Sequence, residues 1–208
     1  GINFRVRRVV GTKAFPRLDP FLLMDDVVLG PPAGYREHPH RGLETVTYVL
    51  PLRLQPRYLA MQMNQAAGAA APTVWEDPVP GVRAGLAHED CTGMKGVTGF
   101  GEVQWLTAGK GIMHAEMPGD DDRIRFLQLW ISLASEHKLC EQVYQDGKPR
   151  SVIVKGVTAN IIAGEAFGIK SNFVTPTACN MVHFTLEPGS QLEHHSPSEG
   201  SAVAHILA

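Results

Sequence analysis

The chain has 208 residues, of which 19 are Lys or Arg and 21 are Asp or Glu, giving a formal net charge of −2 at pH 7. This length excludes a long multidomain protein, and the charge argues against a protein that binds nucleic acid through bulk positive charge. With 44% hydrophobic and 19% charged residues, the chain can bury a core, which excludes wholesale disorder.

Two absences narrow the class of protein further. No apolar run approaches the roughly 18 residues that span a bilayer, and the first residues contain no apolar segment of the signal-peptide type. The three cysteines lie far apart without a CxxC pair, so we expect reduced thiols. A soluble intracellular protein is therefore expected.

Short segments rich in Val, Ile, Thr and aromatic residues recur between Gly and Pro turns, a pattern typical of an all-β sandwich or barrel. In chain order the predicted strands are 4–10, 44–50, 102–108, 123–133, 151–155, 157–164, 181–190 and 202–208. The nearest candidate for a helix is 135–145, which begins with a serine suited to capping and is long enough for about two turns. Because the turn-like sequence DGKPR follows it, we predict a first unit at 1–134, a linker at 135–150 and a shorter second unit at 151–208.

Residues 51–83 interrupt the strand pattern of the first unit. They hold five prolines and an alanine-rich tract, AAGAAAP, between two strand-like stretches. A structureless loop of this length is longer than compact domains normally contain, although its closure costs only about 2 kcal/mol more than that of a short hairpin loop. The segment is interpreted as an insertion, either a true surface loop or material spliced into a hairpin.

Two alternating pairs of side chains are the candidates for chemistry: His38 and His40 in EHPHRG, and His114 and Glu116 in GIMHAEMP. In an extended strand, residues two apart point to the same face, so each pair presents two donor groups side by side. Imidazole nitrogens with one carboxylate suit Fe, Mn, Ni, Cu or Zn, and four such ligands on an octahedral metal leave two open positions. Each pair alone is common by chance in a chain with nine histidines, so solvent-facing histidines at strand ends are the alternative.

Longer strings carry more information than these pairs. EHPHRGLETVTYVL, LAHEDCTG, GEVQWLTAGKGIMHAEMP and LQLWISL resemble the pirin family in order and, once residues 51–83 are set aside, in spacing; LDPFLLMDD, IIAGEAFGIKS and FTLEPGSQL extend the match. The resemblance implies a bicupin, two tandem β-barrels of which only the first holds one mononuclear non-haem iron. Pirins continue beyond the position of AVAHILA, so the second barrel is expected to be incomplete, and its open strand edges favour poor solubility.

The resemblance also implies a ligand set. The family's iron ligands fall on His38, His40, His114 and Glu116, with other divalent metals as alternatives to iron. His38, His40 and Glu44 also spell HxHxxxE, a motif of the broader cupin superfamily in which the glutamate commonly binds the metal. We therefore predict Glu44 as a reserve carboxylate near the metal and as the acceptor of a substrate proton.

Other polar residues near these motifs have structural interpretations. His88 in LAHED is expected to be structural. The adjacent His194 and His195 point to opposite faces of an extended strand, so they form no same-face pair. Arg41 flanks the predicted ligands, and bracing a carboxylate is favoured over pairing with an anionic substrate.

The resemblance implies two alternative functions. The first is an iron-dependent dioxygenase of the quercetin 2,3-dioxygenase type, acting on a flavonol-like substrate through its 3-hydroxyl and neighbouring carbonyl oxygens. The second is an iron-dependent, redox-sensing co-regulator that binds a transcription factor in the nucleus, although the sequence carries no DNA-reading motif. A metal-free protein is a third alternative. The expected location is the cytoplasm, the nucleus or both.

Overall fold

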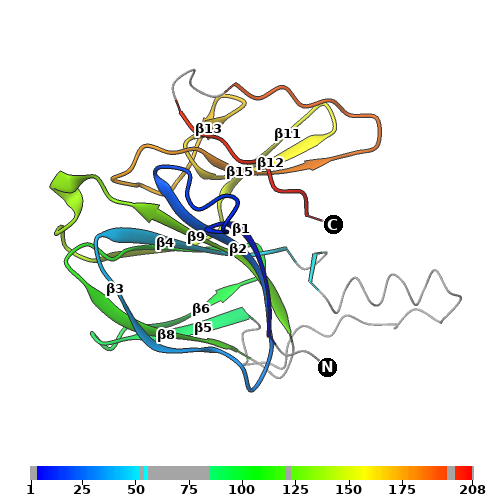
Figure 1. Ribbon diagram of the computed structural model, residues 1–208. Helices are drawn as coiled ribbons and strands as arrows, with labels where there is room; N and C mark the ends of the chain where they lie inside the picture. The colour runs from blue at the N-terminus through cyan, green and yellow to red at the C-terminus, as the bar shows by residue number, and fades with distance from the viewer. Residues whose placement is uncertain (1–3, 52–53, 56–84, 120–122, 196–199, 208) are drawn as a thin grey trace, which may run out of the picture.

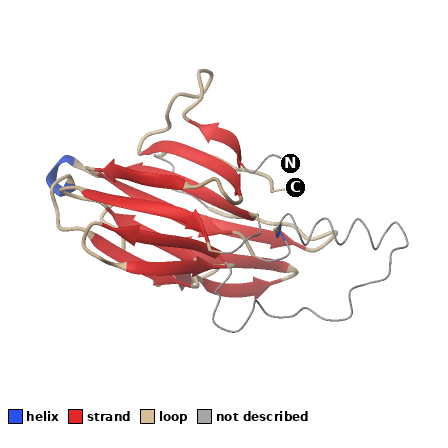
Figure 2. Cartoon of the chain, turned by 90° about the horizontal axis from the view of Figure 1, so that it is seen from below, coloured by secondary structure: helices blue, strands red, loops and turns tan. Residues whose placement is uncertain are grey.

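The computed structural model describes residues 4–51, 54–55, 85–119, 123–195 and 200–207. Within these ranges the regular structure is almost entirely β, and helical structure is limited to short 3-10 turns (Figures 1 and 2). No helix in the same ranges is long and apolar enough to cross a membrane. The predicted all-β class is therefore confirmed.

The largest sheet has six strands in the spatial order β1-β2-β9-β4-β7-β10. Its strands are β1 (Phe4–Val10), β2 (Phe21–Leu29), β4 (Leu43–Val49), β7 (Val103–Thr107), β9 (Ile124–Ser132) and β10 (Val143–Gly147). All neighbouring strands pair antiparallel. Only β1 and β2 are consecutive in the chain, so long-range pairing rather than local hairpins sets the order of this sheet.

A four-stranded sheet, ordered β3-β8-β5-β6, faces the six-stranded sheet and completes the first barrel (Figure 1). Its strands are β3 (Tyr35–His40), β5 (Gly85–Asp90), β6 (Lys95–Gly99) and β8 (Ile112–Pro118). An apolar cluster that includes Leu29, Val49, Leu86 and Phe126 joins the two sheets. The barrel interior is therefore built from both sheets.

The C-terminal part of the chain forms a second, smaller unit on the outer side of the six-stranded sheet (Figure 1). It has a three-stranded sheet, β11 (Arg150–Val154), β12 (Val157–Ala163) and β15 (Met181–Leu186), and a ribbon of β13 (Glu165–Ala166) and β14 (Ile169–Lys170). Trp105 of β7 packs in one buried cluster with Ile162 and Phe173 of this unit. Burial of these apolar side chains holds the two units together.

Two predicted elements differ from the structure. In place of two helical turns at 135–145, a 3-10 turn, η2 (Ser135–His137), is followed by β10, which pairs with β7. The second half of the predicted linker, 135–150, thus belongs to the first barrel. Residues 202–207 form no strand despite their strand-like sequence. Both results depend on which partner strands are available, and a local pattern does not contain that information.

The predicted insertion at 51–83 lies mostly outside the described residues. Near its start, the Gln55 side chain is buried against β9. Its amide nitrogen donates to the backbone oxygens of Leu50 and Arg125, and its Oε1 accepts from the Arg125 N–H at 2.6 Å. The Gln55 side chain therefore forms hydrogen bonds with the backbone of β9, as a neighbouring strand would.

Strand β4 separates two interiors. Thr47 and Val49 face the first barrel, where Thr47 Oγ1 lies 2.8 Å from Gln128 Oε1 and Val49 packs in the cluster between the sheets. Val46 and Tyr48 face the opposite way, into the cluster shared with the C-terminal unit. Because side chains alternate along a strand, each β4 residue belongs to one interior only.

A buried ionic network connects β2, β9 and the segment 202–207. Asp26 accepts hydrogen bonds from Arg125 Nε at 2.9 Å and from Arg125 Nη2 at 2.7 Å, and His205 Nε2 lies 3.1 Å from Asp26 Oδ2. The three side chains are at most 9% exposed. The network therefore ties the end of the described chain to the six-stranded sheet.

We expect acid to destabilise the fold through Asp26. Burial opposes ionisation of this carboxyl, but hydrogen bonds from Arg125 and His205 outweigh it and hold its pKa below the usual value. A group with a lowered folded-state pKa contributes stability that is present above its unfolded-state pKa, about 4, and is lost as the pH falls through the folded-state pKa. The free energy of unfolding from urea titrations should therefore fall as the pH drops below about 4. This fall should be weaker in Asp26→Asn, and an equally steep fall in the variant would contradict the assignment.

Candidate metal centre

The two predicted pairs lie on neighbouring strands of the four-stranded sheet. Strands β3 and β8 are antiparallel, and their register places His38 opposite His114 and Tyr35 opposite Glu116. His114 and Glu116 are 1% and 2% exposed, whereas Met113, the residue before His114 on β8, is 45% exposed. The pleat therefore turns both pairs into the barrel, as the alternation of residues predicted.

Three imidazoles meet inside the barrel. Ring nitrogens of His38, His40 and His114 all lie within 4.8 Å of one another. The Nε2 atoms of His38 and His114 are 3.1 Å apart, and the three ring centroids are separated by 4.5 to 4.9 Å. The nitrogen atoms thus converge on one point between the rings.

This cluster fits a divalent metal. Burial, with the neighbouring His38 as the second cause, lowers the pKa of His40 to about 4. Burial and both neighbouring histidines lower the pKa of His114 to about 3. Both rings are therefore neutral at pH 7, the form that binds metals. His40 Nε2 is buried without a hydrogen-bond partner among the described residues, and a metal ion would coordinate this nitrogen.

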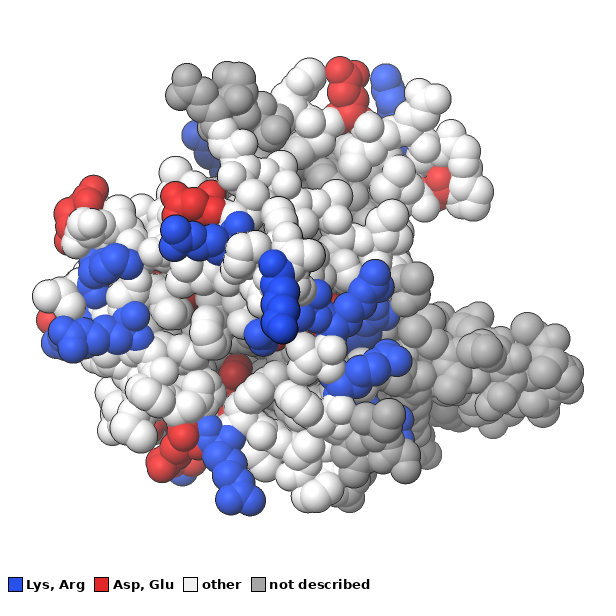
Figure 3. Space-filling view, in the orientation of Figure 1, with Lys and Arg blue, Asp and Glu red and all other residues white. Residues whose placement is uncertain are grey.

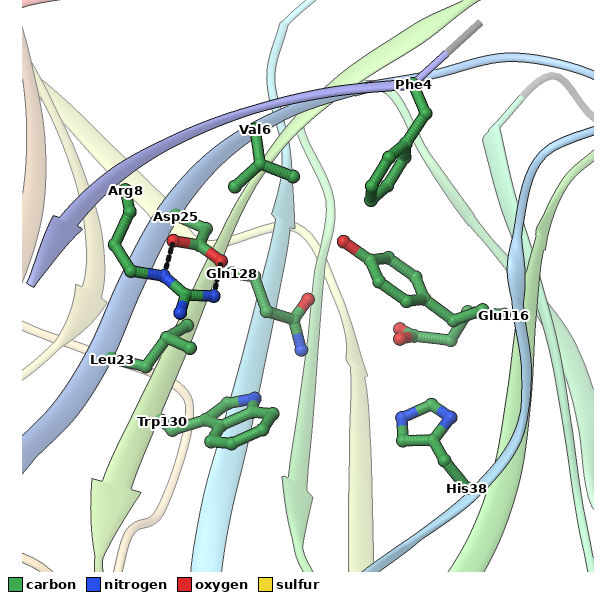
Figure 4. A pocket seen from close by; sticks show the side chains of 10 residues that line it. Phe4, Val6, Arg8, Leu23, Asp25, His38, Glu116, Gln128 and Trp130 are labelled. Carbon is green, nitrogen blue, oxygen red and sulfur yellow. Dashed lines mark hydrogen bonds and ion pairs between the residues drawn. The ribbon is translucent and has the colours of Figure 1, made fainter. Parts of the chain in front are cut away.

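Glu116 lies on the same face of β8 as His114 but outside the group of three histidines. Its carboxylate projects into the cavity from the same wall as His38 (Figure 4). Burial raises its pKa to about 7, against a hydrogen bond from Thr47, whose Oγ1 is 3.2 Å from Glu116 Oε1. A cation in the cluster would favour the ionised carboxylate by direct attraction.

A cavity of about 560 Å³ opens beside the cluster (Figure 4). Its walls come from β1, β2, β3, β8 and β9. The lining residues are Phe4, Val6, Arg8, Leu23, Asp25, Tyr35, His38, Glu116, Gln128 and Trp130. Apolar and aromatic side chains form most of this wall, and Arg8 is neutralised by two hydrogen bonds of 2.9 Å to Asp25. The cavity therefore suits a largely apolar, uncharged ligand.

Two N–H groups face the cavity from β9. Gln128 Oε1 lies 2.8 Å from Thr47 Oγ1, which orients the amide with its NH₂ group toward the cavity (Figure 4). The Trp130 and His40 rings form a T-shaped pair with centroids 5.1 Å apart, and Trp130 Nε1 has no hydrogen-bond partner in the described part of the chain. Neither donor has an acceptor among the residues that the structure describes, so both favour a ligand with acceptor oxygens.

Sequence reasoning missed most of this cavity wall. Phe4, Val6 and Arg8 alternate along β1 and line the cavity, whereas Arg5 and Arg7 are exposed on the other side of the strand. Lys and Arg side chains gather on the surface over β1 and β2 (Figure 3). The alternation of apolar and charged residues was a usable signal for the inner face of β1, but it did not reveal that β1 borders the histidines.

Glu44 does not join the cluster. It is fully buried on the face of β4 that carries Val46, and its Oε1 accepts hydrogen bonds from Trp105 Nε1 at 2.8 Å and Thr107 Oγ1 at 2.9 Å. Burial, and after it the nearby Glu44 carboxyl group, raises the pKa of Cys179 in the C-terminal unit. The expected reserve carboxylate and proton acceptor thus faces away from the barrel interior, because β4 turns this position to the layer between the units.

Arg41 and His88 have different surroundings. Arg41 is exposed and forms no ion pair with a described residue, so it does not brace a carboxylate there. His88 of β5 is opposite Glu116 of β8 and is 7% exposed. His88 therefore lies inside the barrel, next to the cluster.

Comparison with known sequences identifies similar proteins. A family model described as Pirin matches residues 82–131. Pirin-like protein 2 of Arabidopsis thaliana is 39% identical over 206 residues, which cover 97% of this chain and 54% of that protein. The chain spans 54–62% of the length of the first curated relatives that it matches.

Two solved structures are similar in fold. GK1651 from Geobacillus kaustophilus has a TM-score of 0.69 at 27% identity, covering 91% of this chain and 64% of that chain. A quercetin 2,3-dioxygenase from Acinetobacter baumannii has a TM-score of 0.64 at 25% identity, covering 88% of this chain and 58% of that chain. These likenesses confirm the predicted cupin-type fold.

Proposed function

The chain belongs to the pirin family, and from this premise we propose that it is a metal-dependent dioxygenase of the quercetin 2,3-dioxygenase type. The observation that carries the proposal is the convergence of three imidazoles beside a mainly apolar cavity. The fold likeness to a quercetin 2,3-dioxygenase supports the substrate class. The activity is a proposal for the whole protein, since the chain spans only part of its relatives.

We propose iron as the metal, held by the ring nitrogens of His38, His40 and His114, with the Glu116 carboxylate as the fourth ligand. Nitrogen ligands with one carboxylate suit iron, and also manganese, nickel and copper. When bound, the metal supplies a Lewis acid and redox centre toward dioxygen and the oxygens of a flavonol. The raised pKa of Glu116 is consistent with a carboxylate that is buried to meet a cation.

The residues of the cavity bind and orient the substrate. Phe4, Tyr35 and Leu23 border a space that accepts a planar aromatic ligand. Gln128 Nε2 and Trp130 Nε1 donate hydrogen bonds to ligand oxygens, and these two contacts set which edge of the ligand faces the histidines. Because the wall is mostly apolar, a bound ligand excludes water from the cluster.

Oxygen consumption tests this function. Protein prepared without metal and then loaded anaerobically with Fe(II) should consume oxygen when quercetin is added, and metal analysis should find about one iron per chain. A flavone that lacks the 3-hydroxyl is the matched control and should give no consumption. Iron-loaded protein that binds one metal but consumes no oxygen with quercetin would overturn the dioxygenase proposal and favour the co-regulator alternative.

A further inference from the structure

Asp90 is the carboxylate directly behind one of the three histidines. In the register between β5 and β8, Asp90 is opposite His114. Directly opposed residues of an antiparallel pair share a face, with Cβ atoms about 5 Å apart. Both side chains are buried, at 8% and 1% exposure. Asp90 therefore borders His114 on the inner face of the four-stranded sheet.

One carboxylate oxygen of Asp90 has hydrogen-bond partners, and the other has none among the described residues. Oδ1 accepts three hydrogen bonds, from Thr92 N at 2.8 Å, Thr92 Oγ1 at 2.7 Å and Met94 N at 3.1 Å. These bonds fix the orientation of the carboxylate. Oδ2 is buried and has no hydrogen-bond partner among the residues that the structure describes. A buried carboxylate oxygen without a donor is costly, so this oxygen calls for an N–H or O–H group.

His114 also has a buried polar atom without a hydrogen-bond partner among the described residues. Its Nε2 faces His38 Nε2 at 3.1 Å, at the point where the three rings converge. Its Nδ1 is buried without a partner in the described ranges. A neutral imidazole that uses Nε2 as a ligand carries its proton on Nδ1, and this N–H requires an acceptor. Asp90 Oδ2 is the unused acceptor on the neighbouring strand.

Tyr144 of β10 supplies a second donor at the same place. Its ring stacks on that of His88, with centroids 6.1 Å apart and an interplanar angle of 17°. Its hydroxyl is buried and has no hydrogen-bond partner among the described residues. Its hydroxyl is near enough to Asp90 to help lower the pKa of that carboxyl, against the larger opposing effect of burial. Gly96 makes room for this stack, since a Cβ there would lie 2.5 Å from His88 Nε2.

We propose that Asp90, braced by the Tyr144 hydroxyl, is a positioning residue that accepts a hydrogen bond from the Nδ1–H of His114 and so directs His114 Nε2 to the metal. This inference rests on the metal centre of the proposed function. A carboxylate behind a ligating histidine fixes the tautomer and the ring orientation, and it makes the imidazole a stronger electron donor. Asp90 does not touch the metal or the substrate.

Cobalt binding tests this role without any measurement of activity. Co(II) is titrated into metal-free protein, the dissociation constant is obtained by competition with a chelator, and the visible absorption bands of Co(II) are recorded. In Asp90→Asn, the amide oxygen keeps the three bonds of Oδ1, but an NH₂ group replaces Oδ2 and opposes the His114 N–H. We expect about 10- to 100-fold weaker binding and shifted Co(II) bands, with a melting temperature close to that of the wild type.

Two further variants separate the role of Asp90 from general effects of substitution. Tyr144→Phe removes only the brace, and we expect a smaller loss of Co(II) affinity in the same direction. Glu89→Gln is the matched control. Glu89 precedes Asp90 on β5 but is exposed and paired with Lys95 at 2.7 Å. The Co(II) affinity of this variant should therefore equal that of the wild type. If Asp90→Asn and Tyr144→Phe both bind Co(II) within about twofold of wild type with unshifted bands, the positioning role is overturned while the metal centre stands. If the wild-type protein binds no Co(II), the metal centre itself is overturned, and this inference with it.

Discussion

Replacing His114 by alanine is expected to remove metal binding from the protein. His114 is 1% exposed and lies in the middle of the cluster, with its ring centroid 4.5 Å from that of His38 and 4.9 Å from that of His40. Loss of this ligand leaves the imidazoles of His38 and His40 and the carboxylate of Glu116, which lies outside the histidine cluster. We expect the affinity for Fe(II) or Co(II) to fall by more than about 100-fold, beyond the loss typical for a residue behind a ligand.

The measurement is metal content after loading and desalting, together with oxygen uptake on quercetin. His137→Ala is the matched control, because His137 is an exposed histidine in η2 and should leave both quantities unchanged. The metal-free variant should melt near the wild type, since removing one ring also removes crowding among three closely packed imidazoles. A His114→Ala protein that retains one metal per chain would contradict the proposed site.

Replacing Arg125 by methionine is expected to be the most destabilising change in the ionic network. Asp26 would keep its burial, at 5% exposure, but lose two short hydrogen bonds and its charge partner. Leaving one member of a buried ion pair uncompensated costs about 3–5 kcal/mol. Because His205 still contacts Asp26, we expect a loss toward the lower end of this range, and methionine retains the apolar stem of arginine. The free energy of unfolding from urea titration at pH 7 measures this loss.

Two variants show whether the loss arises from the uncompensated charge. Lys95→Ala removes an exposed ion pair with Glu89 and should cost about 1 kcal/mol or less. The double variant Asp26→Leu with Arg125→Met removes both charges and should recover part of the stability, because an apolar pair needs no partner charge, although the buried His205 loses its Asp26 partner. A double variant no more stable than Arg125→Met alone would contradict this explanation.

The HxHxxxE motif of the broader cupin superfamily led to a wrong position for Glu44. His38, His40 and Glu44 would share a face if the strand were continuous, because even spacings keep one face in a strand. However, β3 ends at His40, and β4 begins at Leu43 after Gly42, whose φ of +68° is favourable only for glycine. This turn carries the chain from the four-stranded sheet into the six-stranded sheet, so the alternation starts again and Glu44 faces the other interior.

The sequence by itself determined the all-β class and the same-face arrangement within each of the two pairs, His38 with His40 and His114 with Glu116. These features are local, since strand alternation and turn residues act over a few positions. Only the tertiary structure decided that β3 pairs with β8 in the register that brings His38 to His114, and that β1 and β9 close the cavity beside them. It also decided that β10 joins β7 and brings Tyr144 to Asp90. The reason is that a strand pattern specifies which faces are apolar but not which distant strand will cover them, and that choice depends on the packing of the whole chain.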